Sequence, residues 1–184
     1  MHDANRTANL LGAAVLAIGD LVRAETASAA GTSASGAAAL VVLADAPDLS
    51  GTELGRRIGL SQPAAARMVD GLAEAGLVRR QRGSGKSVAI RLTAAGRDAA
   101  DRALAARHDT LAGSIAGLDP ARQATLAELL GTVLDRVYDR IGSAELICRL
   151  CDRAACVARQ ASCPVGAAQR ERSGSDQREW SEDG

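Results

Sequence analysis

Aromatic side chains are almost absent from this sequence: its 184 residues include Tyr138, Trp180 and no phenylalanine. The core must therefore be built from alanine, leucine, valine and isoleucine. Such a core favours close packing between helices and disfavours an all-β sandwich, which depends on aromatic and β-branched residues. We therefore expect a mainly α-helical protein, and the length suits one domain with an appendage.

The overall charge points to no particular partner, because 22 basic residues balance 22 acidic ones. Charge must therefore be examined locally. No apolar run approaches the ~18 residues that span a bilayer, and the N-terminal sequence lacks the pattern of a signal peptide. We expect a cytoplasmic protein with no membrane partner, whose cysteines bind metal or sense redox state rather than form structural disulfides.

Helical patterns dominate the first part of the chain. Apolar residues recur every three or four positions over residues 5–28, which predicts an amphipathic helix, and a very apolar helix is expected over 35–44. Two shorter helices follow, with Ser50 and Ser61 placed as N-caps and with Glu53 completing a capping box. Their spacing predicts a helix-turn-helix.

The sequence pattern changes after Gly76, which is placed to end the second short helix. Residues 77–80 and 88–92 are predicted strands around a glycine-rich loop, which together form a β-hairpin. Thr93 then caps a long helix, and Pro120 opens another. The expected fold is mainly α with a small β-hairpin wing, a winged helix-turn-helix.

The second helix of the motif and the hairpin carry the candidate DNA contacts. Gln62 and Arg67 are placed to reach base edges or phosphates in the major groove, and the small residues from Ala64 onward let the backbone approach DNA. Residues 50–92 include eight basic and three acidic residues. Their local net charge of +5 suits phosphate binding. The candidate DNA-binding residues are Ser61, Gln62, Ala64, Arg67, Arg80, Arg82 and Lys86.

Four segments occur in a distinctive order here: GLSQP at 59–63, MVDGL at 68–72, AGLVRR at 75–80 and IRLTAAG at 90–96. With them the chain resembles, over about residues 5–142, the MarR family of winged-helix transcription factors. The resemblance implies homodimers that bind palindromic operators, usually as repressors released by a small-molecule effector or by thiol oxidation.

The wing departs from the family pattern. The family often has Asp-Arg-Arg there, with the last arginine reaching the minor groove, whereas this chain has Ser84, Gly85 and Lys86. Lys86 would replace that contact as a point charge without guanidinium geometry. The aspartate that steadies the loop is missing, so we expect a looser wing.

The expected organisation has three parts, and the first contains both DNA-binding and dimerisation elements. The parts are a MarR-like domain over 1–142, a cysteine-rich metal-binding segment over 143–168 and a disordered acidic tail over 169–184. Within the first part, DNA binding is assigned to about 35–93 and dimerisation to about 5–28 and 94–142. A dimer is expected because a single helix-turn-helix seldom binds tightly without a second half-site.

All four cysteines lie within sixteen residues, with the spacing C-x2-C-x4-C-x6-C: Cys148, Cys151, Cys156 and Cys163. Four thiolates match a closed tetrahedral zinc site and equally an iron–sulfur cluster. Buried structural cysteines would be scattered over the fold, and a thiol switch needs only one or two. We favour a metal centre, with zinc ahead of an iron–sulfur cluster and a metal-free redox switch third.

Two function classes follow from these patterns. The first is a sequence-specific regulator, not an enzyme, whose four-cysteine centre modulates DNA binding. The second is a metal-binding redox or small-molecule-modifying enzyme that uses the winged helix as a scaffold. Binding to the DNA upstream of its own gene would separate them.

Overall fold

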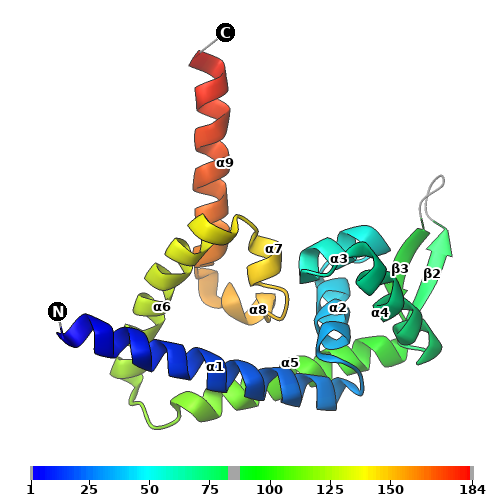
Figure 1. Cartoon of the computed structure of the whole chain (residues 1–184), viewed down its shortest axis with the longest axis horizontal. Coiled ribbons are helices and arrows are strands. Elements are labelled where there is room, and N and C mark those ends of the chain that lie inside the picture. The colour runs from blue at the N-terminus through cyan, green and yellow to red at the C-terminus, as the bar shows by residue number, and fades with distance from the viewer. Residues whose placement is uncertain (1, 83–87, 183–184) are drawn as a thin grey trace. The chain divides into compact units, whose positions relative to one another are not determined.

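The computed structural model describes residues 2–82 and 88–182 and divides into two compact units, 1–117 and 118–184 (Figure 1). The expected fold class is confirmed: helices dominate, and one small antiparallel sheet accompanies them. The first unit contains α1 (His2–Ala30), α2 (Ala34–Asp45), α3 (Gly51–Ile58), α4 (Gln62–Glu74) and α5 (Ala94–Ile115).

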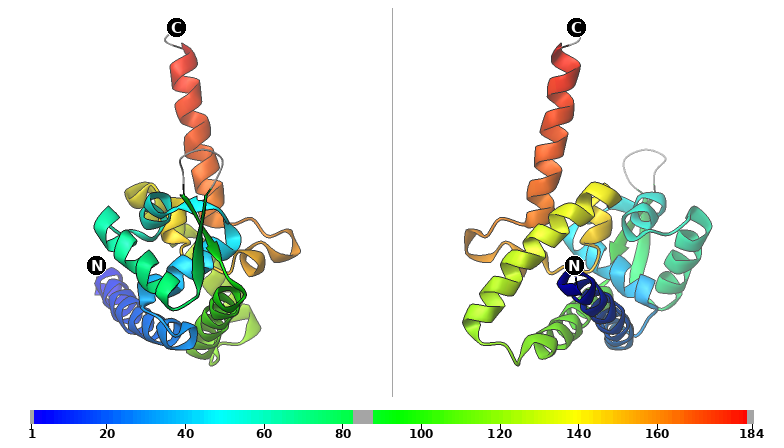
Figure 2. Two further views of the ribbon diagram at one scale, coloured as in Figure 1. Left: turned by 90° about the vertical axis from the view of Figure 1, so that its right-hand side faces the viewer. Right: turned by 60° about the vertical axis from the view of Figure 1, so that its left-hand side comes forward.

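The core of the first unit is built largely from alanine, as the composition requires. Helix α5 lies beside α1 and also packs on α2 (Figures 1 and 2). The facing surfaces bury small side chains almost completely, including Ala37, Ala39, Ala99, Ala100 and Ala103. Small side chains let the helix backbones approach closely, so the core is filled without aromatic side chains.

The sheet has three antiparallel strands in the order β1 (Leu49–Ser50), β3 (Val88–Leu92) and β2 (Val78–Arg82). The predicted hairpin is therefore present, with Val78 opposite Leu92 at its base. Strand β1 was not expected, because two residues carry no periodicity and only their pairing with β3 defines them. The hairpin loop, with Ser84, Gly85 and Lys86, lies outside the described residues.

Thr93 joins the base of the wing to α5. Its hydroxyl donates to the Gly76 carbonyl at 2.7 Å and accepts the Gly96 N–H at 3.0 Å, so one side chain caps α5 and holds the turn before β2. The space at Gly96 is closed, because an added Cβ would stand 1.9 Å from the Leu77 carbonyl oxygen. The wing is thereby fixed to the helix that follows it.

The second unit contains α6 (Pro120–Ile141), α7 (Ala144–Ile147), α8 (Arg153–Cys156), the 3-10 helix η1 (Ala158–Gln160) and α9 (Pro164–Glu182). Its core is small: Tyr138, Val165 and Ala168 form the buried cluster. Arg172 of α9 lies with its guanidinium 5.8 Å from the centre of the Tyr138 ring and pairs with Asp139 of α6 at 2.5 Å.

The C-terminal part of the chain is largely helical in the structure. The structure divides into its two compact units at residue 117, and within the second unit α6 packs on α9. Disorder was expected from residue 169, whereas α9 continues to Glu182. Glutamine, arginine and glutamate in that segment are good helix formers, and Arg172 anchors its first turns to α6.

Helix α1 also corrects the expectation that no segment is apolar enough to cross a bilayer. By length and composition alone its residues Asp3–Ala30 pass that test, with a mean hydropathy of 1.3 in the most apolar window. None of that window is buried within the chain. An exposed apolar helix of this kind also suits packing against a partner helix.

Candidate nucleic-acid interface and cysteine cluster

The helix-turn-helix depends on two glycines, Gly55 within α3 and Gly59 directly after it. Gly59 adopts the left-handed conformation, with φ 76°, and turns the chain towards α4. Gly55 is buried where the two helices cross, and a Cβ built there would stand 2.5 Å from the Cβ of Ala65. The crossing therefore requires glycine on α3 and sets the position of α4.

The N-terminal end of α4 is open to solvent. Ser61, Gln62 and Arg67 are exposed, while Ala64 is half-buried. The expected cap at Ser61 is corrected: its hydroxyl makes no capping hydrogen bond. Pro63 explains part of this, because it has no N–H to donate at the second helical position. The hydroxyl at this end is thus available to a phosphate.

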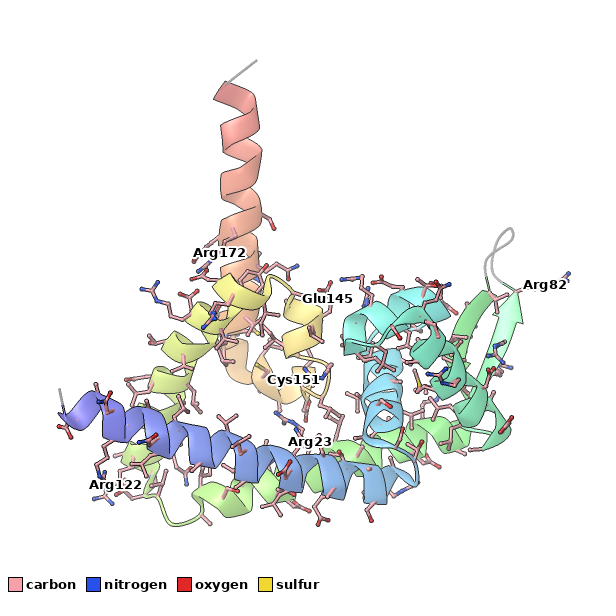
Figure 3. All side chains as sticks on the ribbon, viewed as in Figure 1. Arg23, Arg82, Arg122, Glu145, Cys151 and Arg172 are labelled. Carbon is pink, nitrogen blue, oxygen red and sulfur yellow. The ribbon has the colours of Figure 1, made fainter. Side chains whose placement is uncertain are left out.

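The candidate arginines of β2 differ in their surroundings. Arg80 forms an ion pair with Asp70 of α4, which ties the strand to the helix. Arg82 lies two residues further along the same strand, on the same face of the sheet. Figure 3 places it at the end of β2, where the described strand stops.

Three further arginines of this region are paired with carboxylates. Arg56 and Arg57 share Glu53, whose pKa their guanidinium groups lower to about 2. Arg91 likewise pairs with Asp48, and this hydrogen-bonded contact lowers the pKa of that carboxyl.

Three arginines remain exposed, and none of them forms an ion pair within residues 2–82 and 88–182: Arg67, Arg79 and Arg82. The local positive charge available to a ligand is therefore concentrated on α4 and β2. Arg79, counted among the basic residues but not among the candidate contacts, is thus one of the three exposed arginines. Its exposure on an edge strand could not be derived from spacing.

Comparisons with known proteins decide the family. The "MarR family" sequence model matches residues 31–86, which span the helix-turn-helix and the start of the wing. A MarR family protein of Mycobacterium tuberculosis, solved with salicylic acid, is 30% identical over 67% of this chain and 95% of its own, with a TM-score of 0.52. The chain belongs to the MarR family.

Other MarR structures agree with this assignment. A regulator from Silicibacter pomeroyi is 30% identical, with 68% of this chain and 86% of its own covered and a TM-score of 0.53. A Bacillus stearothermophilus family member has a TM-score of 0.64 at 20% identity, covering 77% of this chain and 97% of its own, which supports the fold. A search of curated proteins found no match. MarR proteins are transcriptional regulators, so the chain is a DNA-binding regulator by family.

The four cysteines lie in the second unit, at the ends of its short elements. Cys148 follows α7, Cys156 ends α8 and Cys163 directly precedes α9. Figure 3 shows Cys151 on the connection between α7 and α8. Within the described residues these four cysteines form no disulfide, and all four are partly exposed.

Neighbouring thiols in this segment raise one another's pKa. A hydrogen bond with the Cys151 thiol, together with burial and the nearby sulfurs, raises the pKa of Cys148. Burial and contacts with Cys163 and Cys151 raise the pKa of Cys156 to about 11. In the described part of the chain, no three histidine, cysteine, aspartate or glutamate side chains stand together as a formed metal site.

Proposed function

We propose that this MarR protein acts as a homodimeric repressor that binds palindromic operators, with α4 in the major groove and the wing against the flanking backbone. The observation that carries this proposal is the open N-terminal end of α4 beside the exposed arginines Arg67, Arg79 and Arg82. A family member from Mycobacterium tuberculosis, 27% identical, was solved in complex with DNA. Helix-turn-helix proteins read bases with the N-terminal residues of this helix, which here include Gln62 and Arg67.

Dimerisation is supported by apolar side chains that the chain itself leaves in solvent. On α1, Leu10, Val15 and Leu16 are 55%, 61% and 69% exposed. On α6, Leu129 and Leu130 are 60% and 46% exposed. Apolar surface of this extent on two amphipathic helices suits burial against a second copy, and a two-fold dimer matches a palindromic operator.

Two inputs would regulate the dimer. One is a small organic effector, since a relative was solved with salicylic acid. The other is the four-cysteine segment as a metal centre that modulates operator affinity. It packs on α6, the helix that carries part of the proposed dimer surface. A coupling free energy of roughly 1–3 kcal/mol is typical between two such sites.

Operator binding tests the proposal directly. Purified protein is titrated against the DNA upstream of its own gene, and binding is followed by fluorescence anisotropy in excess nonspecific DNA. Arg67→Ala should weaken binding by roughly 1–3 kcal/mol if the side chain reads a base. Arg140→Ala, an exposed arginine of α6, serves as the matched control and should leave affinity unchanged. Equal operator affinity for the Arg67 variant and wild type would refute the proposed placement of α4. If the wild-type protein did not bind operator DNA at all, the enzyme alternative would be favoured.

A further inference from the structure

The small sheet of the first unit has two unlike faces. Val78 of β2 and Ile90 and Leu92 of β3 are buried, so their side of the sheet faces the core. Because side chains alternate along a strand, the residues between them point to the opposite side. We call that side the outer face of the wing, and it consists of Arg79, Gln81, Ala89 and Arg91.

Two arginines stand directly opposite each other on the outer face. Arg79 of β2 pairs with Arg91 of β3 in the register of the sheet, and residues in such positions have Cα atoms about 4.5–5.5 Å apart. Like charges placed directly opposite each other destabilise a sheet. Arg79 is exposed and makes no ion pair with any residue that the structure describes. This arrangement therefore favours an anion beside the two guanidinium groups.

Asp48, the residue before β1, provides a carboxylate to one of these arginines. It accepts two hydrogen bonds from the Arg91 guanidinium, with Nη2 and Oδ2 2.6 Å apart. Its backbone is left-handed there, with φ 69°, a conformation that residues other than glycine seldom adopt. The two side chains remain 42% and 44% exposed, and exposed ion pairs contribute little to stability. The carboxylate can therefore be exchanged for another anion at low cost.

The carboxylate does not reach the second arginine. Strand β3 lies between β1 and β2, so Asp48 and Arg79 lie on opposite sides of Arg91. A guanidinium group binds carboxylate and phosphate oxygens with the same paired N–H donors. A phosphate between Arg79 and Arg91 would contact both arginines, whereas the carboxylate of Asp48 neutralises only one.

The position of the outer face indicates where such a phosphate comes from. Arg80 points from the inner face of β2 and pairs with Asp70 of α4, so the outer face is the side of the wing away from α4. Figure 1 shows β2 and β3 beside α4. A duplex that lies along α4 and continues past the wing would bring its sugar–phosphate backbone to this side.

We propose that the outer face binds one backbone phosphate of the DNA that flanks each half-site, held between Arg79 and Arg91. Asp48 takes the place of that phosphate on Arg91 when DNA is absent. The inference rests on the proposed function for the DNA itself. It adds a contact outside the segment that α4 reads, and it adds a carboxylate within the protein that competes with the DNA for Arg91.

Operators with single neutral linkages test the contact. Each duplex extends about one helical turn beyond both half-sites, and one flanking phosphate on each side is replaced by a methylphosphonate. Wild type should lose about threefold or more in affinity at one flanking position, because a charge contact is removed there. Arg79→Gln should bind the unmodified duplex correspondingly more weakly and should not respond at that position. Its salt slope should fall by about one per subunit.

A matched control uses an arginine of the same strand. Arg82→Gln removes an exposed arginine from the opposite face of β2 and should keep the wild-type response to the flanking methylphosphonate. Arg79→Gln should also unfold at the same or a higher urea concentration than wild type, because it relieves the opposition to Arg91. Weaker operator binding by this variant would then not result from unfolding.

Asp48→Asn tests the exchange of anions. Asparagine tolerates the left-handed backbone as aspartate does, but it leaves Arg91 without its carboxylate. Operator binding should therefore tighten by about threefold or more, and Arg91→Gln in the same chain should cancel the gain. Unchanged or weaker binding by Asp48→Asn would overturn the competition.

The same titrations separate this inference from the proposed function. An equal response of wild type and Arg79→Gln at every flanking position would overturn the phosphate contact. Wild-type protein that binds the operator but ignores all flanking methylphosphonates would contradict this inference alone. Wild-type protein that binds no operator would contradict the proposed function as well.

Discussion

The crossing of α3 and α4 makes Gly55→Ala an informative perturbation. The new Cβ would stand 2.5 Å from the Cβ of Ala65, whereas apolar carbons pack at about 3.5–4.0 Å. The helices must therefore separate by about 1 Å or more, and overpacking of this kind destabilises by typically 1–3 kcal/mol. Alanine regains up to about 1 kcal/mol in helix propensity, so we expect a net loss of about 1–2 kcal/mol.

A matched control isolates the clash. Gly71→Ala places the same substitution within α4, where a Cβ meets nothing within 4 Å, and should stabilise by roughly 0.5–1 kcal/mol. In urea unfolding followed by far-ultraviolet circular dichroism, the two variants should thus shift in opposite directions. Gly55→Ala should also weaken operator binding, because it displaces the helix that carries Gln62 and Arg67.

The partner residue allows a double-mutant cycle. Ala65→Gly removes the methyl group that meets the new Cβ, at a propensity cost of about 1 kcal/mol. Combined with Gly55→Ala it should be more stable than the sum of the single changes predicts, with a coupling of about 1–3 kcal/mol. A Gly55→Ala protein as stable as Gly71→Ala, or additive single changes, would refute the close crossing.

Three further predictions address other parts of the molecule. Leu130→Glu should dissociate the proposed dimer and abolish palindrome binding together, as measured by sedimentation and anisotropy; a single-chain mass for wild type at micromolar concentration would contradict the dimer. Asp70→Asn should release Arg80 for phosphate contact, so operator binding should tighten at low salt and the salt slope should steepen by up to about one; an unchanged slope would show that Arg80 lies away from DNA. The lowered pKa of Glu53 implies stabilisation that is fully present above its ordinary value of 4.5 and is lost as the pH falls towards about 2. Glu53→Gln should flatten that part of the acid unfolding curve, and an unaltered curve would exclude the contribution.

Local signals predicted the elements of the winged helix. Gly59 and Gly76 both have positive φ, at 76° and 71°, where helices were expected to end. Ser50 accepts the Glu53 N–H at 3.1 Å and Thr93 caps α5, as their positions indicated. Caps and turns depend on residues within a few positions of one another, so they can be predicted from the sequence alone.

Contacts between residues far apart in the chain could not be predicted from the sequence. Asp48 lies 43 residues from its partner Arg91, and nothing in the local pattern links them. The carboxylate of Glu53 binds two arginines, so only half of the expected capping box is supported by a hydrogen bond. The packing of α6 on α9 likewise joins residues far apart in the sequence and was not predicted.

The candidate sites were predictable to different degrees. Exposure at Gln62 and Arg67 follows from their place on an amphipathic helix, and the cysteine pattern was visible in the spacing. The engagement of Arg80 by Asp70 required the fold, because it determines which arginines remain available. The role assigned to Lys86 stays a prediction, since the residue lies outside the described range.

The unequal distribution of aromatic residues makes the two units spectroscopically distinct. Tyr138 and Trp180 both belong to the second unit, and the unit that carries the winged helix has no aromatic side chain. Near-ultraviolet absorption, fluorescence and circular dichroism from these rings thus report on the cysteine-bearing unit. The Tyr138 ring, packed beside Arg172 and Cys148, should respond if the proposed four-cysteine centre binds a metal ion. A single tryptophan introduced on α4 of a Trp180→Phe variant would then be the protein's only tryptophan and would report on the proposed DNA-binding helix. Tyr138 would report on the second unit in the same sample.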